Sequence, residues 1–481
     1  MNSNKKNMKI NYKKIACFTF AVGVLVGCDD FLDVDKRKDV TQEDSGTVYE
    51  PVQFVNGIYG MMTEWDYAFS YLGITEIISD NADKGSSPTD PGGDKGLLDG
   101  LTHTATVGSV EAMWTNWYKA IGRATYSIQY TEDFGLTDEA YKNRLIGEAK
   151  FLRAYHYFFL VRGWGDVPLQ HIDLVNRVPK AQVYDFIEQD LLDAIATLPE
   201  KSEYAPEDLG RATKGAAKAL LAKVYLYQQD WANAYEYANQ VIGSGEYGLE
   251  SDYATLWREE TENGVESIFE VQARGESIAH GVQQYSETQG ARGTSGWGWG
   301  FNTPSQNLLN AFNAEGDNIR RDATIIFRGE TMYDGRVVSM AVENPMYNEK
   351  AYSSANAGAG DGDKNIRVLR LAEIYLIRAE AANELNNSDV ATSSLNEVRG
   401  RVNLGNVSFS SQTQMRAAIW KERRLELAFE HDRWFDLIRT GQAEAAMAAD
   451  GKTLVVGRHE LFPIPNNQLI ATPGMVPNPG Y

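Results

Sequence analysis

The sequence predicts a mostly α-helical fold in which pairs of helices form a scaffold, and a loop-rich, partly β insertion lies on that scaffold. Several long segments place apolar residues at helical spacing, which predicts helices with one buried face. Two of these segments repeat the same plan. Between residues 251 and 365 the chain instead carries Gly-rich stretches and short alternating runs, which predict the insertion.

The first half of the chain contains four segments with helical spacing. They cover residues 51–64, 110–121, 148–163 and 183–198. The third is apolar all round, which is typical of a helix buried on most sides, and we expect it to form an antiparallel pair with the fourth. Residues 81–100 are crowded with Gly, Pro, Ser and Asp, so we expect an exposed loop there.

The repeated plan covers residues 211–242 and 370–401. Each repeat has two helical segments with a small residue in each, and the two small residues are twelve positions apart: Ala222 and Ala234 in the first repeat, Ala379 and Ala391 in the second. Small residues let two helices cross closely, and this spacing is typical of tetratricopeptide repeats. Both repeats lack the consensus Trp and Pro, so the pattern is tetratricopeptide-like.

The insertion and the C-terminal part have their own signals. Residues 264–273 alternate as a strand does, and residues 320–340 suggest a hairpin that turns at Asp334 and Gly335. Residues 412–440 have a helical pattern, whereas the tail from Phe462 is Pro-rich and predicted to be extended.

The N-terminus predicts export. Five Lys residues precede an apolar run over 15–26, which is the size of a signal-peptide core and too short to span a bilayer. Leu25, Val26, Gly27 and Cys28 resemble a bacterial lipobox, so we expect a lipoprotein signal peptide over 1–27 and lipid on the Cys28 sulfur.

After the predicted signal peptide, the sequence predicts two further regions. Residues 28–47 form an acidic tether, and residues 48–481 form a single body. The body divides into an N-terminal helical part (48–250), the loop-rich, ligand-binding insertion (251–365), and a C-terminal helical part with its tail (366–481).

Charge and composition disfavour several classes of function. The net charge is −20, and removing residues 1–27 takes away five Lys and no acid, which leaves −25, so nucleic acid is not an expected partner. The two cysteines, Cys17 and Cys28, leave the mature body without a thiol for a disulfide or a zinc site. The six His residues lack metal-ligand spacing and no catalytic motif is present, so we expect no metal, no cofactor and no enzyme activity.

Three strings carry a resemblance to a known family. Residues 422–441 (ERRLELAFEHDRWFDLIRTG), 148–169 (EAKFLRAYHYFFLVRGWGDVPL) and 461–465 (LFPIP) resemble segments of the SusD/RagB family of outer-membrane lipoproteins. The tether CDDFLDV, residues 396–401 (NEVRGR) and residues 114–123 (WTNWYKAIGR) are also similar to that family.

The resemblance implies a function and a place in the cell. It implies a surface-exposed, non-catalytic glycan-binding lipoprotein, held at the outer membrane by the lipid on Cys28 and facing the cell exterior. Such a protein covers a SusC-like TonB-dependent transporter, captures oligosaccharide or polysaccharide, and delivers it. One alternative is a RagB-like lid that takes oligopeptides. A more remote one is a surface glycoside hydrolase, because some of the 66 acidic residues will always lie close enough to form a pair.

Sugars present C–H faces and hydroxyl rims, so an aromatic platform with polar neighbours is the expected site. The first candidates are Trp297 and Trp299 in a Gly-rich loop, for which the alternative role is loop anchoring. The further candidates are aromatic residues just past the first helix and polar residues that could bond hydroxyls: Trp65, Tyr67 and Tyr71, then Asn81, Asp83, Lys84, Arg292 and Asn302. In contrast, Trp114 and Trp117 are expected in the core, and Arg433, Trp434, Asp436 and Arg439 in the scaffold.

Overall fold

The computed structural model of the chain describes residues 49–87, 89–90, 93–170, 173–274, 281–354 and 362–481. The predicted signal peptide (1–27), the lipid-bearing Cys28 and the tether (28–47) lie outside the described residues. Within the described ranges, none of the helices combines the length and the apolar character needed to cross a membrane.

The N-terminal part of the body contains the predicted antiparallel pair. Helix α8 (Glu139–Trp164) packs against α9 (Lys180–Thr197), and the short strands β2 (Val167–Leu169) and β3 (Asp173–Val178) connect them. Two ion pairs join the helices, Lys150–Asp193 and Arg153–Asp190. Because the residue numbers rise on one helix as they fall on the other, the pair is antiparallel, as predicted.

Two more helices complete this N-terminal part. Helix α7 (Gly108–Asp133) packs on α8, and α3 (Pro51–Tyr59) packs on α7. Trp114 and Trp117 of α7 are buried, which confirms their expected place in the core.

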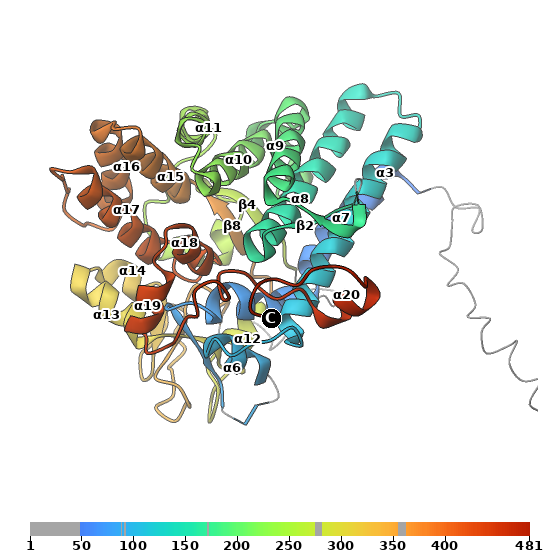
Figure 1. Cartoon of the computed structure of the whole chain (residues 1–481). Helices are drawn as coiled ribbons and strands as arrows, with labels where there is room; N and C mark the ends of the chain where they lie inside the picture. Colours follow the sequence, from blue (N-terminus) through green and yellow to red (C-terminus); the bar gives the residue numbers. More distant parts are fainter. Residues whose placement is uncertain (1–48, 88, 91–92, 171–172, 275–280, 355–361) are drawn as a thin grey trace, which may run out of the picture. The chain divides into compact units, whose positions relative to one another are not determined.

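The two predicted repeats are present and lie next to each other. The first consists of α10 (Lys214–Gln228) and α11 (Trp231–Gly243), and the second of α15 (Leu371–Glu384) and α16 (Ser388–Arg401). The four small residues that identified them, Ala222, Ala234, Ala379 and Ala391, are fully buried. Helix α11 packs directly on α15, so successive contacts run from α8 through α9, α10, α11 and α15 to α16, the upper row of helices in Figure 1.

The insertion leaves and re-enters the scaffold as one two-stranded sheet. Strand β4 (Ser267–Val271), predicted from its alternation, pairs antiparallel with β8 (Ile366–Arg370), although almost a hundred residues separate them. This pairing closes the insertion at its base. Helix α10, which precedes the insertion, and helix α15, which follows it, contact each other beside this sheet.

The interior of the insertion differs in part from the prediction. A tight turn does form at Asp334 and Gly335, where the Met332 amide donates to the Arg336 carbonyl at 2.8 Å. Arg320, however, lies in the short helix α14 (Asn318–Asp322), so the predicted hairpin begins too early. Further elements of the insertion are α12 (Tyr285–Gln289), α13 (Gln306–Glu315), and the antiparallel strands β6 (Ile325–Phe327) and β7 (Met346–Asn348).

The expectation of an exposed loop over 81–100 is wrong. Strand β1 (Ala82–Gly85) pairs antiparallel with β5 (Phe301–Pro304), and α6 (Gly93–Asp99) follows it. Asn81, Lys95 and Leu98 are buried. The local composition gave a correct signal for turns but contains no information about a strand partner more than two hundred residues away.

The C-terminal helical segment is interrupted. Helix α17 (Gln412–Glu426) and α18 (Arg433–Arg439) are separated by a turn in which Phe429 and His431 have positive φ angles, 64° and 70°. Helix α19 (Ala443–Ala449) follows, and the tail contains the short helix α20 (Asn466–Ala471), so the tail is not extended throughout.

The remaining elements are short helices. They are η1 (Gly60–Thr63), α4 (Trp65–Ala68), α5 (Ser70–Leu72), the π-helix η2 (Gly73–Ile77), η3 (Lys201–Glu203), η4 (Pro206–Asp208), η5 (Thr255–Trp257), η6 (Glu259–Thr261) and η7 (Gly281–Gln284).

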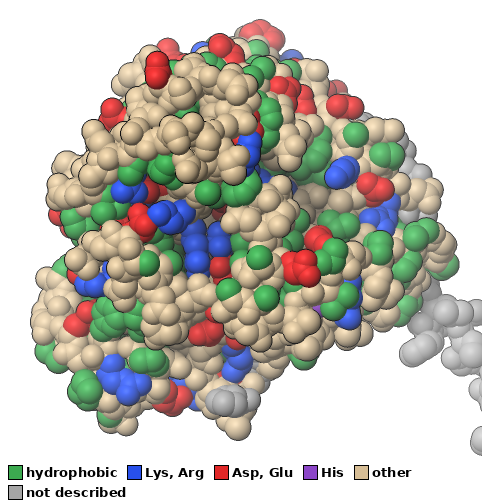
Figure 2. Space-filling model, turned by 60° about the vertical axis from the view of Figure 1, so that its left-hand side comes forward, with side chains coloured by type: hydrophobic (Ala, Val, Ile, Leu, Met, Phe, Trp, Pro, Cys, Tyr) green, Lys and Arg blue, Asp and Glu red, His purple; other side chains and the backbone are tan. Residues whose placement is uncertain are grey.

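A buried ion-pair network joins the insertion to the scaffold. The Glu426 carboxylate of α17 contacts Arg320 of α14 at 2.9 Å and Arg370 of β8 at 2.6 Å, and it also contacts Arg401 of α16. These guanidinium groups hold the pKa of Glu426 well below its usual range despite its burial. Cations are also present at the surface: Figure 2 shows Lys and Arg side chains gathered in a hollow near the middle of one face.

The Arg433–Arg439 string has the structural role expected of it. Arg433 makes two hydrogen bonds to Asp80, at 2.7 and 2.8 Å, and Arg439 binds Glu380 and Asp436. Trp434 is buried. These side chains satisfy one another and tie α18 to its neighbours.

Candidate functional site

Trp65 and Trp299 come together from distant parts of the chain. Their ring centroids are 5.5 Å apart. Trp65 stacks on Phe69 at 5.3 Å, and Phe69 meets the edge of Phe301 at 5.1 Å. We call Trp65, Phe69, Trp299 and Phe301 the aromatic platform. Trp65 is 36% exposed and Trp299 is half-buried, so the platform reaches the surface while Phe69 and Phe301 support it.

The Gly-rich loop places Trp299 by close backbone contacts. The Trp299 amide donates to the Glu287 carbonyl at 2.9 Å, and the Gly300 amide donates to the Gly290 carbonyl at 2.8 Å. A Cβ atom on Gly298 would lie 2.3 Å from the Glu287 oxygen. Only glycine therefore allows the loop to approach α12 closely enough to present Trp299.

Trp297 does not join the platform. Its ring centroid lies 5.6 Å from that of Tyr352 and 6.5 Å from that of Tyr347, and the Arg336 guanidinium lies 4.6 Å from it. It is partly buried against a separate apolar cluster of the insertion. The two tryptophans of the Trp-Gly-Trp string thus belong to different surroundings, and loop anchoring describes the place of Trp297.

Lys95 lies beneath the platform, and the sequence did not indicate this. Its ammonium group is 3.6 Å from the Phe69 ring centroid and donates to the Ser109 hydroxyl at 2.7 Å. Burial lowers the pKa of Lys95 to about 8, and the nearby Asp94 carboxylate opposes that shift. A buried cation against one ring adds a cation–π interaction that fixes the position of Phe69.

Tyr67 and Tyr71 are core residues, so the expectation that they contact a ligand is corrected. Both side chains are buried, and burial raises the pKa of each phenol. The Tyr67 hydroxyl accepts a hydrogen bond from the Trp117 indole at 3.1 Å, and the Tyr71 ring lies 4.3 Å from that of His431. These tyrosines alternate with Trp65 and Phe69 along the chain, and they face inward.

Asn81 and Asn302 are also interior and are corrected for the same reason. The Asn81 side-chain oxygen accepts from Arg424 at 2.8 Å, and the Asn302 amide donates to Gln289 at 2.9 Å. Their polar atoms hold the β1–β5 pair against its neighbours.

Lys84 and Arg292 lie at the edge of the aromatic region, and Asp83 precedes Lys84 on β1. The Lys84 ammonium is 5.7 Å from the Phe301 ring centroid. Arg292 is partly exposed beside Gly300 and pairs with Asp90 at 2.9 Å and with Glu343 at 3.1 Å. Asp83 is partly buried, and burial together with Asp99 raises its pKa to about 6.

Sequence reasoning missed Phe69 and Phe301. A signal for each was present: Phe69 follows Trp65 by four positions, and Phe301 follows Trp299 by two. Such spacings bring side chains to one face in a helix and in a strand, respectively, although Phe69 lies just past α4 and Trp299 lies just before β5.

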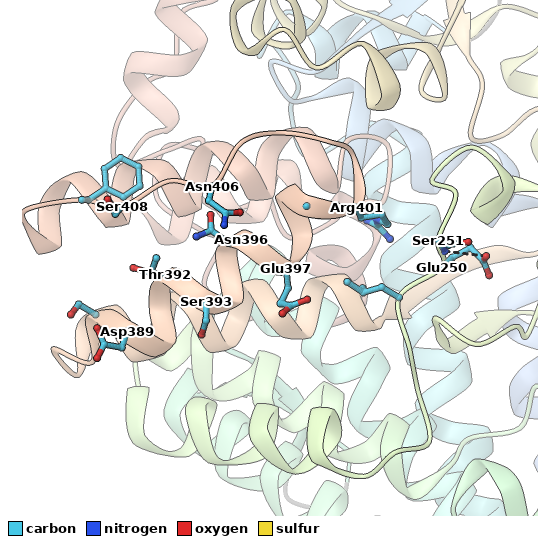
Figure 3. Close-up of a pocket in the computed structure, with 14 residues that line it drawn as sticks. Glu250, Ser251, Asp389, Thr392, Ser393, Asn396, Glu397, Arg401, Asn406 and Ser408 are labelled. Carbon is cyan, nitrogen blue, oxygen red and sulfur yellow. Dashed lines mark hydrogen bonds between the residues drawn. The ribbon is translucent and has the colours of Figure 1, made fainter.

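A groove elsewhere on the body contains none of the predicted site residues. It has a volume of about 930 Å³ and runs along α16. Figure 3 shows that its wall is a polar stripe of that helix, with Asp389, Thr392, Ser393, Asn396 and Glu397 along it and Asn406 and Ser408 on the facing segment. Among the described residues no three His, Cys, Asp or Glu side chains are grouped so that they could hold a metal ion.

Two family models match the chain. The model described as "SusD family" matches residues 265–481, and the model described as "Starch-binding associating with outer membrane" matches residues 30–226. Together they span most of the body.

Curated relatives match over similar lengths. SusD-like protein P2 of Formosa agariphila is 29% identical and aligns with 95% of this chain and 97% of its own length. The starch-binding protein SusD of Bacteroides thetaiotaomicron is 27% identical and aligns with 74% of this chain and 76% of its own length.

Solved structures share the fold. A structure described as a laminarin binding SusD-like protein has a TM-score of 0.75 and 29% identity, and it covers 90% of this chain and 99% of its own. Surface glycan-binding protein A from Bacteroides fluxus has a TM-score of 0.77 at 23% identity, covering 90% of this chain and 99% of its own, which supports the same mostly helical fold. The family models, the full-length relatives and the shared fold together show that this chain belongs to the SusD/RagB family.

Proposed function

We propose that this protein binds a glucose-containing polysaccharide or oligosaccharide on the aromatic platform and delivers it to a SusC-like TonB-dependent transporter of the outer membrane. The observation that supports this most directly is the convergence of Trp65 and Trp299 at the surface. Two tilted indole rings at 5.5 Å offer a non-polar surface for the C–H face of a sugar ring.

The edge of the platform supplies polar groups. Lys84 and Arg292 lie beside Phe301 and Gly300, where they can reach the hydroxyl rim of a sugar on the rings. Because Arg292 already pairs with two carboxylates and the Lys84 ammonium donates to the Ser87 carbonyl, we assign affinity mainly to the rings and orientation to these side chains.

The choice of glucan rests on the relatives. One relative is named for starch and one related structure for laminarin, and both of these polymers consist of glucose. Starch and laminarin are therefore the first ligands to test.

Binding is tested by affinity electrophoresis in gels that contain starch or laminarin. We expect Trp299→Ala and Trp65→Ala each to weaken retention at least tenfold, which corresponds to about 1.4 kcal/mol. Trp297→Ala is the matched control, because it removes the same side chain from the same loop but not from the platform. Wild-type retention by both platform variants would contradict the proposal.

Two outcomes would select another function. Binding of oligopeptides by a protein that no polysaccharide retains would favour the peptide-binding alternative. Release of reducing sugar by the pure protein, abolished by replacing one carboxylate, would favour the hydrolase.

The outer-membrane location is supported by the description of the second family model and by the lipobox-like string before Cys28. We expect wild-type protein to partition into detergent and Cys28→Ala to remain in the aqueous phase. Copurification of wild-type protein with a barrel transporter from outer membranes tests delivery, and its absence under gentle extraction would contradict it.

A further inference from the structure

A second cavity lies at the C-terminal tail, and none of the platform residues lines it. We call it the tail pocket: it has a volume of about 480 Å³ and is enclosed by the end of α8, the start of α9, α18 and residues 476–479. Figure 1 shows the C-terminal segment, in red, running beneath the row of helices. The volume falls within the range of roughly 300–1,000 Å³ that small-molecule sites occupy.

The wall of the tail pocket is mainly apolar and aromatic. Tyr184 of α9, Tyr227 of α10 and Phe435 of α18 line it, together with aliphatic side chains that include Ile438 and Leu461. Phe435 is buried, and the Tyr184 phenol is desolvated enough that its pKa rises to about 12. This wall suits the apolar body of a ligand.

Four cations line the same pocket, against one acidic side chain, Asp166. The two deeper cations are already neutralised: Arg162 pairs with Asp432 at 2.9 Å, and Arg439 pairs with Glu380 at 2.7 Å. Their charges hold the scaffold together and contribute little net charge to the cavity.

The two cations at the mouth, Arg177 and Lys180, are different. Among the described residues, the Arg177 guanidinium donates only to uncharged oxygens: the carbonyls of Asp166, Val476 and Trp164, and the side-chain oxygen of Asn478. These bonds use four of its five N–H groups and leave one Nη1 hydrogen. The Lys180 side chain is exposed and makes no hydrogen bond or ion pair within the described part of the chain. With Asp166 counted against them, the mouth carries one net positive charge.

We propose that the tail pocket binds a small amphipathic carboxylate, with the anionic group at Arg177 and Lys180 and the apolar body against Tyr184, Tyr227 and Phe435. A neutral sugar fits less well, because the Asn478 amide, the polar group on the tail, is fully used: it donates to Trp164 and Phe462 carbonyls and accepts from Arg177. This site is independent of the aromatic platform and shares no residue with it.

Isothermal titration with 3-phenylpropionate and with its uncharged amide tests the proposal on the full mature chain. We expect the acid to bind at least tenfold more tightly than the amide. Lys180→Glu reverses the charge at the mouth and should weaken binding of the acid at least tenfold. Lys142→Glu is the matched control, because Lys142 lies twenty residues before Arg162 on α8, about 30 Å away at ~1.5 Å per residue.

Three results would overturn the proposal: equal binding of acid and amide, undiminished binding of the acid by Lys180→Glu, or no binding of the acid at millimolar concentration by a protein that unfolds cooperatively. A final titration uses a sugar acid, galacturonate, which carries the carboxylate without an apolar body. If it binds and 3-phenylpropionate does not, the assignment of an apolar body is wrong. Cooperative urea unfolding of each variant shows that the body is intact and keeps this test separate from that of the proposed function.

Discussion

At the scale of single residues, the Trp-Gly-Trp string shows how far residue type alone determines a role. Trp297 and Trp299 have the same side chain and lie in the same loop, yet one packs against Tyr352 and the other joins Trp65. The glycine between them decides this, because its lack of a Cβ lets the backbone pass beside Glu287.

Gly298→Ala is therefore expected to weaken glucan binding without altering any group on the platform. The added methyl would lie 2.3 Å from the Glu287 oxygen and 2.5 Å from the Gly290 Cα, so the loop must move and Trp299 with it. A forced shift of this kind costs about 1–3 kcal/mol. Gel retention and urea unfolding measure the two effects.

Gly405→Ala is the control, since a Cβ there meets no atom within 4 Å. Equal retention by Gly298→Ala and Gly405→Ala would show that the tight loop contact does not position Trp299.

At the scale of elements, the body depends on helices that meet through small residues. Helix α11 packs on α10 and on α15, and Ala234 is fully buried at this position in the row. A close-packed interior has no free volume for a longer side chain.

Ala234→Leu should lower the free energy of unfolding by about 1–3 kcal/mol, because three extra carbon atoms must enter a filled contact. Ala232→Leu provides the comparison: it lies two positions away on the same helix and is exposed, so it should change stability by less than about 0.5 kcal/mol. Urea unfolding followed by circular dichroism measures both. A similar loss for the two variants would mean that helix propensity, not packing, sets the effect.

At the scale of the whole body, the insertion is held to the scaffold by the β4–β8 sheet and by the Glu426 network. The Glu426 carboxylate contacts the guanidinium groups of Arg320 in the insertion, of Arg370 in strand β8 at the base of the insertion, and of Arg401 in the second repeat. Removing it leaves these buried cations short of one carboxylate.

Glu426→Ala is expected to destabilise the body by about 3–5 kcal/mol at pH 7. The pKa of Glu426 is lower in the folded protein than in the unfolded chain, where it is about 4.3. Ionised Glu426 therefore stabilises the fold fully at pH values above this unfolded-state pKa, and the stabilisation declines as the pH falls below it. The stability gap between wild type and variant should therefore narrow below pH 4.3, as chemical denaturation at pH 7 and pH 3.5 can measure.

Glu444→Ala, an exposed position on α19, serves as the control and should leave stability nearly unchanged at both pH values. A gap for Glu426→Ala that widens on acidification would refute the assigned charge state.

The sequence alone determined what depends on neighbours along the chain. Apolar spacing defined α8 and α9, and the twelve-residue spacing of small residues identified both repeats. Helical periodicity is a local property, because residues three and four positions apart share a face.

The tertiary structure alone decided what depends on contacts between distant segments. It joined α11 to α15, paired β1 with β5 in a stretch predicted as loop, and sent Tyr67 and Tyr71 inward. It also brought Trp65 to Trp299 across more than two hundred residues. Composition marks an aromatic residue as able to bind a sugar, but whether its ring faces solvent or the core is set by packing partners that local sequence does not contain.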